Sequence, residues 1–493
     1  MVASLRSKAL TGLIWSAIER FSVQGVQFVV TIILARLVSP EDFGLIGMIT
    51  VFILLSDIII NGGFSQALIQ KNNRTQVDYS TVFYFNLCIA IILYLIIYFS
   101  APYVADFYSQ DKLTTVLRVL AISIVIKSLC VVQNAIVSVN LNFKLRTKIN
   151  LISALISGGL AVFFAYHGYG IYALIYQVII FSSLVSLFSF MLIRWFPSVA
   201  FSFHSLRTLF NFGSKLLIAS MVRTVVDNCY AILIGRFLSI RDVGFYTQGR
   251  NIPDVLSMNL FNVLQNVFFP LMSSVQNDKE RLLRIYIKSI EGTAFIIIPA
   301  MVGLMYIADP FVMYFLSAKW AGAIVVIQWI ALSRIIIPIS ALNCSIMNAI
   351  GRSDVYLRVD LMKLPLTVGA LLITFSYGLQ TIVIGNIVVS IICYFINAYY
   401  PGKWFGFGAI AQLKRIMPIV GCTLLMAIVL HFVSSQNHLL EIIYKVIIGA
   451  PVYIIASLFF KIRPCVELIK ILSEKVKSRK PRGKKDEKYS DYK

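Results

Sequence analysis

The chain has 493 residues, of which 59% are hydrophobic and only 13% charged, and its mean hydropathy is +0.83. Soluble domains carry about 25% charged residues, so this composition excludes a water-soluble enzyme. The formal charge of +22 would suggest nucleic acid as the partner of a soluble protein. Here, however, the basic residues alternate with long apolar runs, so the lipid bilayer is the expected partner and nucleic acid is not.

Fourteen apolar runs have the length of about 20 residues that crosses a bilayer as a helix. Because they are continuously apolar and do not alternate, barrel strands are not expected. The chain is therefore predicted to be an all-α, polytopic membrane protein. In chain order the expected spans lie at 10–35, 43–70, 80–105, 113–140, 149–168, 170–195, 208–235, 243–272, 286–307, 323–349, 357–377, 379–400, 413–433 and 442–460.

The basic residues between the spans predict the orientation, because cytoplasmic loops are enriched in Lys and Arg. If the N-terminus is cytoplasmic, the inner segments before the tail carry eighteen basic residues and the tail from Lys461 carries twelve more. The outer loops carry five, namely Arg36, Lys112, Arg236, Arg241 and Lys319. Both termini are therefore predicted to be cytoplasmic, and most of the positive charge encodes topology.

An internal repeat divides the chain. The segment IILARLVSPEDFG (Ile32–Gly44) recurs as ILIGRFLSIRDVG (Ile232–Gly244), and a weaker match pairs Leu120–Ser123 with Ile330–Ser333. The repeat covers six spans, so both copies have the same orientation. This predicts two lobes related by a pseudo-two-fold axis along the membrane normal, with substrate handled between them, as in many transporters.

The expected domains follow from this repeat. They are an N-terminal six-helix lobe (1–200), a C-terminal six-helix lobe (201–405), an extra helix pair (406–461) and a basic cytoplasmic tail (462–493).

The repeated segments and their flanks resemble a known family. GLIWSAIERFSVQGVQFVVTIILARLVSPEDFG, GGFSQALIQK and VVDNCYAILIGRFLSIRDVGFYTQGRNIPDVLS are similar to the Wzx-type flippases of lipopolysaccharide, capsule and exopolysaccharide biosynthesis. The resemblance covers residues 4–461. The family belongs to the multidrug/oligosaccharidyl-lipid/polysaccharide exporter superfamily.

This resemblance implies a substrate and a location. The substrate is an undecaprenyl-diphosphate-linked oligosaccharide, moved from the cytoplasmic to the periplasmic leaflet of the bacterial inner membrane. By analogy with the related lipid II flippases, the extra helix pair borders a groove for the lipid tail. The chain is expected to be a transporter and no enzyme, and to act as a monomer.

Ionisable residues inside the spans are the candidate site, because such groups usually face protein or a wet cavity. The basic residues expected to line the cavity and to bind the diphosphate are Arg20, Lys127, Arg223, Arg250, Arg334 and Lys363. Arginine suits this role because its planar donors form two parallel hydrogen bonds to phosphate oxygens. Glu19, Asp57 and Asp227 are candidates for binding a coupling proton or sodium ion.

Pairing within helices is the alternative interpretation of these charges. Arg223–Asp227 and Arg250–Asp254 are spaced i,i+4 and Asp360–Lys363 is spaced i,i+3, so each pair can neutralise itself. Lys127 and Arg334 have no obvious partner in their own helices and are expected to be unpaired cavity charges.

The family resemblance bears on three of these charged positions. It implies functional charges in the first and eighth helices, which Arg20 and Arg250 match. These charges are those of the related lipid flippases, which also tend to carry a basic residue in the second helix, where this sequence has Asp57.

No motif for a metal or organic cofactor is recognised. The seven cysteines are scattered without a C-x-x-C motif, and no phosphate-binding G-x-x-x-x-G-K-[ST] motif occurs. Pro253, Pro299, Pro338 and Pro365 are expected inside helices, where they are candidate kinks. The tail is expected to bind anionic lipid, with polysaccharide polymerase or glycosyltransferase as the alternative partner.

Two other functions stay open at this point. An exporter of drugs or small amphiphiles shares the superfamily, although the extra helix pair argues against it. A membrane polymerase or glycosyltransferase acts on the same lipid, but such enzymes commonly carry a large outer loop, which this sequence does not provide.

Overall fold

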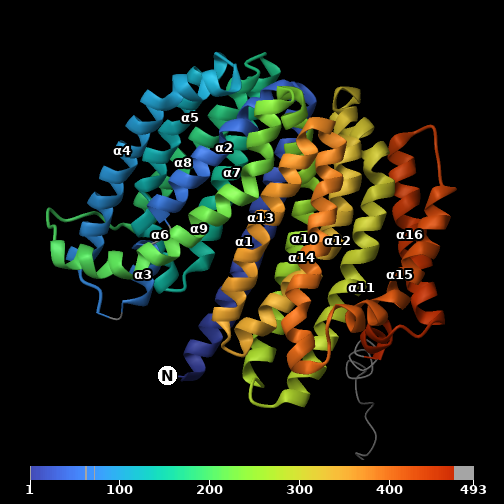
Figure 1. Cartoon of the computed structure of the whole chain (residues 1–493). Helices are drawn as coiled ribbons and strands as arrows, with labels where there is room; N and C mark the ends of the chain where they lie inside the picture. Colours follow the sequence, from blue (N-terminus) through green and yellow to red (C-terminus); the bar gives the residue numbers. More distant parts are fainter. Residues whose placement is uncertain (1, 62–63, 72, 471–493) are drawn as a thin grey trace, which may run out of the picture. The chain divides into compact units, whose positions relative to one another are not determined.

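The computed structural model describes residues 2–61, 64–71 and 73–470, and these residues form helices joined by short connections (Figure 1). The first half of the chain contains α1 (Val2–Leu37), α2 (Pro40–Asn61), α3 (Phe64–Gln70), α4 (Gln76–Tyr108), α5 (Lys112–Ser128), α6 (Val131–Val139), α7 (Phe143–Tyr166), α8 (Ile171–Ile193) and α9 (Phe203–Phe237). The second half contains α10 (Ile240–Ser274), α11 (Lys279–Phe311), η1 (Val312–Leu316), η2 (Ala318–Trp320), α12 (Ala321–Ala349), α13 (Ser353–Thr374), η3 (Phe375–Tyr377), α14 (Leu379–Phe405), α15 (Ala409–His431) and α16 (His438–Phe459).

The all-α, polytopic prediction is confirmed. Within the described residues, twelve helices are long and apolar enough to cross a membrane, and thirteen if the bent pair α5–α6 counts as one span. The expected span at 208–235 lies in α9, where a run of side chains falls outside the described residues.

One of the predicted spans is interrupted. The span expected at 113–140 is divided between α5 and α6, which meet at a bend of 40°. At this bend the amide of Leu129 donates to the carbonyl of Ile126 and that of Cys130 to Lys127, so the ladder tightens to i→i+3 bonds. Hydrophobicity alone does not reveal such a break. The span expected at 43–70 contains α2 and α3, and residues 62–63 between them lie outside the described residues.

The described chain forms two compact units. Unit 1 comprises Met1–Asn251, Val312–Val326 and Leu364–Gly385, and unit 2 comprises Ile252–Phe311, Ile327–Lys363 and Asn386–Lys493. Helices α10, α12, α13 and α14 contribute residues to both units. The domain boundaries at residues 200, 405 and 461 stay a prediction.

Unit 1 is built on α1, α2, α4, α5, α7, α8 and α9. Helix α1 packs along α7, α4 along α5, and α2 against α9 (Figure 1). Helices α4, α7 and α9 begin with a side chain that accepts from a free backbone amide of the first turn. At the start of α4, the hydroxyl of Thr75 accepts from the amide of Asp78, whose carboxylate accepts in return from the Thr75 amide.

Unit 2 contains the helix pair that the sequence sets apart. Helices α15 and α16 pack against each other and both pack against α11 (Figure 1). Tyr286, Ile290, Met426 and Tyr453 belong to the apolar core they share. The Tyr453 hydroxyl donates to the carbonyl of Phe295 at 2.8 Å, so the pair is fixed to α11 by a buried hydrogen bond as well as by apolar contact.

The four prolines expected inside helices are there: Pro253 in α10, Pro299 in α11, Pro338 in α12 and Pro365 in α13. The basic tail beyond residue 470 lies outside the described residues, and its lipid-binding role stays a prediction.

Candidate functional site

The two repeated segments fold into the same local structure. Each forms the corner between two long helices, α1–α2 in the first copy and α9–α10 in the second. Ser39 and Ser239 precede the second helix of each corner, and their hydroxyls accept from the amides of Asp42 and Asp242, both at 3.1 Å. The identical Ser and Asp of the sequence repeat are therefore matching helix caps.

The two corners meet each other inside unit 1, and the contact is reciprocal. A Cβ atom added to Gly44 would lie 2.0 Å from the carbonyl oxygen of Ile240, and one added to Gly244 would lie 2.1 Å from that of Pro40. The backbones of α2 and α10 therefore touch where any side chain would collide. The repeated glycines exist for this close approach, and the exchange of equivalent contacts is what a pseudo-two-fold axis requires.

The repeated arginines also make equivalent contacts. Arg36 donates to the carbonyl of Tyr314 at 3.4 Å, and Arg236 donates to that of Phe107 at 2.7 Å. The first corner has an additional contact, because the buried indole of Trp320 donates to the Ala35 carbonyl at 2.7 Å. Each arginine therefore ties its corner to a helical segment of the other repeat.

Lys127 was expected to be an unpaired cavity charge, and this expectation is wrong. Its ammonium group lies 2.7 Å from the carboxylate of Asp57, so an ion pair joins α5 to α2. Both side chains are about a quarter exposed. The acid at position 57 of α2 therefore has a basic partner on α5.

Glu19 and Arg20 of α1 have different surroundings. The Glu19 carboxylate lies 3.0 Å from Arg146 and accepts from the Asn150 amide at 2.7 Å, both on α7. Arg20 is exposed. The neighbouring acid therefore joins α1 to α7.

Asp227 and Arg250 face each other in unit 1. Arg250 donates to the backbone carbonyl of Asp227 at 2.8 Å, which joins α10 to α9. The side chain of Arg223 lies outside the described residues, so its pairing with Asp227 stays a prediction.

Arg334 was also expected to be unpaired, and this too is wrong. It forms an ion pair with Asp254, which joins α12 to α10 within unit 2. The Arg334 side chain is only 7% exposed. Its other guanidinium donor reaches the Ser333 hydroxyl at 3.3 Å, and that hydroxyl donates to Asn386 at 3.0 Å. Asp254 therefore pairs with Arg334 of another helix, whereas the i,i+4 spacing of the sequence suggested Arg250.

Unit 2 also contains the Lys363–Asp360 and Glu291–Arg415 pairs. The Lys363 and Asp360 side chains lie 2.6 Å apart, as the i,i+3 spacing predicts. Glu291 pairs with Arg415 of α15 at 3.6 Å. Most membrane charges described here are therefore matched with an opposite charge on another helix. Such pairs make the charges tolerable in a membrane, and an anionic ligand has to compete with the carboxylates for the bases.

One buried polar cluster was not predicted from the sequence. Tyr286 donates to the Asn343 side chain at 2.5 Å, and the Gln412 amide donates to Asn343 at 2.8 Å and to the Phe407 carbonyl at 3.0 Å. All three side chains are fully buried, and they join α11, α12 and α15. Each of these polar residues stands within an apolar helix, which is a sign of a buried hydrogen bond. The sequence does not show which residues bond to each other, because the partners are distant along the chain.

These features define a class of protein: a multi-pass helical membrane protein with an internal pseudo-two-fold repeat and paired intramembrane charges. Solved structures share its fold. The lipid II flippase MurJ in an inward closed conformation matches with a TM-score of 0.68 and 17% identity, covering 92% of this chain and 99% of that one. An inward-facing multidrug resistance MATE family transporter of the MOP superfamily matches with a TM-score of 0.61 and 17% identity, covering 78% and 98%.

The chain belongs to the family described as polysaccharide biosynthesis proteins, whose model matches residues 33–325, more than half of its length. It is 24% identical to the succinoglycan biosynthesis transport protein ExoT of Rhizobium meliloti over 98% of this chain and 99% of that protein. It is also 24% identical to the teichuronic acid biosynthesis protein TuaB of Bacillus subtilis, over 71% and 73%. The lipopolysaccharide biosynthesis protein WzxC of Escherichia coli is 24% identical over 79% and 80%. The family resemblance of the sequence is confirmed.

Proposed function

We propose that this protein is a flippase that moves undecaprenyl-diphosphate-linked oligosaccharide units from the cytoplasmic to the outer leaflet by alternating access. The product would feed lipopolysaccharide, capsule or exopolysaccharide assembly. One observation carries the proposal: nearly the whole chain matches both a relative named as a polysaccharide transport protein and the fold of a lipid II flippase. A lipid carrier linked to sugar is the substrate that agrees with both matches.

The extent of the matches favours a lipid substrate over a drug. The lipid II flippase fold covers 92% of this chain, whereas the MATE transporter fold covers 78%. The α15–α16 pair, packed on α11, is the element that the sequence analysis sets apart from a twelve-helix exporter. A long polyprenyl chain needs an apolar surface beside the cavity, and two added helices extend that surface.

We infer transport without catalysis. The relative that matches nearly the whole chain is named as a biosynthesis transport protein, and the described connections at the expected outer side are short. They include 109–111 between α4 and α5, 167–170 between α7 and α8, and 432–437 between α15 and α16, and the longest, between α11 and α12, is 312–320. A polymerase or glycosyltransferase of the same lipid commonly needs a larger outer segment for its catalytic residues.

The intramembrane charges supply the proposed binding chemistry. Arg20 is exposed and Arg250 is partly exposed, so their guanidinium groups are accessible to diphosphate oxygens, with Arg223 as a third candidate. Lys127, Arg334 and Lys363 would contribute only by exchanging Asp57, Asp254 and Asp360 for the ligand. Glu19, Asp57 and Asp227 remain the candidates for a coupling proton or sodium ion.

We further propose a bacterial inner-membrane location with both termini cytoplasmic. The basic residues of the connecting segments support this orientation. The protein is proposed to act as a monomer and to pass its product to a polymerase.

The test is the lipid that accumulates when the protein is removed. In a strain that lacks the gene, lipid-linked oligosaccharide should build up, and mass spectrometry of extracted membranes should detect it. A membrane-impermeant lectin or glycosidase applied to spheroplasts should not reach the sugar until the membrane is opened. If no such lipid accumulates and only drug sensitivity changes, the drug-exporter alternative is correct.

A further inference from the structure

A cavity in unit 2 lies apart from the intramembrane charges. It has a volume of about 470 Å³ and is lined by Gln276, Lys279, Leu282, Ile350, Lys403, Trp404 and Phe405. They lie at the start of α11, at the end of α14 and, for Gln276 and Ile350, just beyond the ends of α10 and α12. Its volume is in the range of small-molecule sites, and the part of the chain that forms its lining provides two lysines and no acidic residue.

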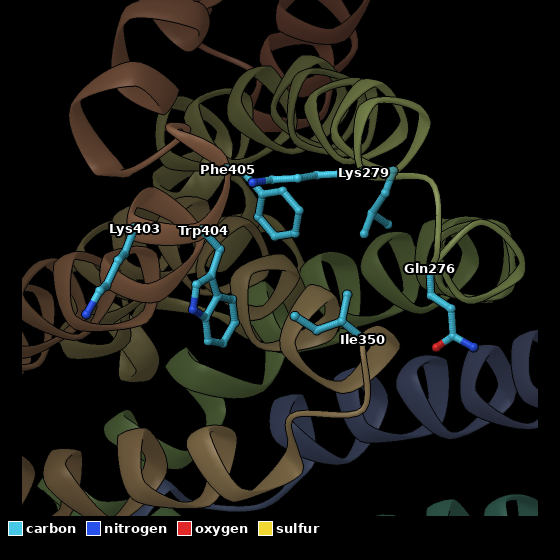
Figure 2. Close-up of a pocket in the computed structure, with 7 residues that line it drawn as sticks. Gln276, Lys279, Ile350, Lys403, Trp404 and Phe405 are labelled. Atoms are coloured by element: carbon cyan, nitrogen blue, oxygen red, sulfur yellow. The ribbon is translucent and has the colours of Figure 1, made fainter.

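The side chains combine cationic and aromatic groups. The Lys279 ammonium group lies 5.9 Å from the centre of the Phe405 ring, and Figure 2 shows it over that ring. Trp404 and Ile350 lie beside each other in the same view, with Lys403 and Gln276 at opposite edges of the group. The buried Leu282 supplies an apolar floor. The cavity therefore offers positive charge at its rim and an apolar surface within.

The neighbouring arginine leaves this positive charge intact. Arg352 lies 5.6 Å from the centre of the Trp404 ring, and its guanidinium pairs with the Asp354 carboxylate at 3.1 Å. Asp354 is therefore satisfied by its own arginine, which keeps the local balance positive.

The position of the cavity along the helices matches the membrane–water interface. It lies at the end of unit 2 where α10, α12 and α14 end and α11, α13 and α15 begin. That end also carries the basic residues Arg281, Arg284, Lys288, Arg358, Lys414, Arg415, Lys461 and Arg463. Its acidic residues are fewer, namely Asp278, Glu280, Glu291, Asp354, Asp360 and Glu467. The opposite end carries Lys445, which pairs with Glu441 at 2.5 Å. An excess of bases marks the cytoplasmic leaflet, and tryptophan beside lysine is typical of headgroup depth.

We propose that this cavity binds the phosphate headgroup of an anionic phospholipid of the cytoplasmic leaflet. Lys279 and Lys403 would bind the phosphate oxygens, and the Trp404 and Phe405 rings would contact the glycerol and the first methylenes of the chains. Lysines bind phosphate as flexible point charges, so no fixed fork geometry is needed. The site is separate from the intramembrane charges assigned to the transported lipid, and the proposal does not depend on that assignment.

The test compares two variants that lose the same charge. The full-length protein is purified with native lipid removed and titrated with phosphatidylglycerol or with phosphatidylethanolamine, and bound lipid is counted by native mass spectrometry. Lys279→Gln/Lys403→Gln removes the two lysines of the cavity. Arg281→Gln/Lys414→Gln removes two exposed positive charges at the same end but outside the cavity. Circular dichroism and thermal unfolding confirm that both variants fold.

We expect wild-type protein to retain phosphatidylglycerol in preference to phosphatidylethanolamine. Each lysine near an anionic lipid contributes about 1 kcal/mol, so losing both should weaken tight phosphatidylglycerol binding about 30-fold. The control variant Arg281→Gln/Lys414→Gln should bind phosphatidylglycerol nearly as the wild type does. Equal losses in the two variants would mean only diffuse attraction and would overturn the proposal. Farnesyl diphosphate is titrated in parallel. If Lys279→Gln/Lys403→Gln keeps phosphatidylglycerol binding but loses farnesyl diphosphate binding, the proposal is also overturned, because the cavity would then bind prenyl diphosphates.

Discussion

The backbone contact, or crossing, of α2 and α10 at Gly44 and Gly244 in unit 1 gives the most specific prediction about movement of the two corners. The Cβ of Gly44→Ala would lie 2.0 Å from the Ile240 carbonyl oxygen, whereas ordinary contact begins at 3.4 Å. The two backbones would have to separate by about 1.4 Å, the difference between these distances. Inserting a methyl group into a packed contact costs about 1–3 kcal/mol. The conformation in which α2 and α10 touch should therefore become about 5–150-fold less populated relative to conformations in which the two corners are apart.

Cross-linking measures this population directly. The side chains of Glu41 and Arg241 lie 3.5 Å apart across the crossing. Cysteines at these two positions, in a protein whose seven native cysteines are replaced, should react with a short bismaleimide. We expect rapid cross-linking in the otherwise unchanged protein and much slower cross-linking when Gly44→Ala is added.

Gly25→Ala is the matched control. It also adds a methyl group to a helical glycine, but no atom lies within 4 Å of the added Cβ. It should leave the cross-linking rate unchanged and stabilise α1 by up to about 1 kcal/mol. If Gly44→Ala cross-links as fast as Gly25→Ala, the close approach does not govern the crossing and the reasoning fails.

Two charge substitutions should separate a ligand-binding role from a structural one. Arg20→Ala removes an exposed side chain, so we expect polysaccharide export to fall while protein abundance and thermal stability stay near wild type. Normal export at equal abundance would remove Arg20 from the proposed site. Arg334→Ala leaves the Asp254 carboxylate without its ion-pair partner, and breaking a buried pair costs about 3–5 kcal/mol. We expect a clear loss of thermal stability in detergent, with part of it recovered in the double variant Arg334→Ala/Asp254→Ala. An unchanged melting temperature for the single variant would show that this pair does not stabilise unit 2.

The sequence predicted the helices and the repeat well, because both depend on local patterns. Apolar runs of bilayer length gave the helices, and the shared Ser, Asp and Gly of the two corners proved to be the same caps and the same close approach. Ser39 and Ser239 could be recognised as matching positions, but nothing in the sequence indicated that Gly44 and Gly244 would face each other's helices.

The partners of the intramembrane charges were predicted least well from the sequence. Lys127 and Arg334 were expected to be unpaired because no acid lies three or four residues away in their helices. Their partners, Asp57 and Asp254, are separated from them by 70 and 80 residues. Helical spacing reports contacts along one helix, whereas membrane charges find partners on any neighbouring helix. The break between α5 and α6 was missed for a similar reason, since both halves are equally apolar.

The central claim is that this protein moves a lipid-linked oligosaccharide across a membrane, and translocation in proteoliposomes tests it most directly. Purified protein is reconstituted into vesicles that contain a fluorescent polyprenyl-diphosphate oligosaccharide in both leaflets, and a membrane-impermeant glycosidase is added outside. With the protein present, cleavage should proceed beyond the outer-leaflet half at a rate that Arg20→Ala lowers. Cleavage that stops at half, as in protein-free vesicles, under every ion gradient applied would contradict the claim.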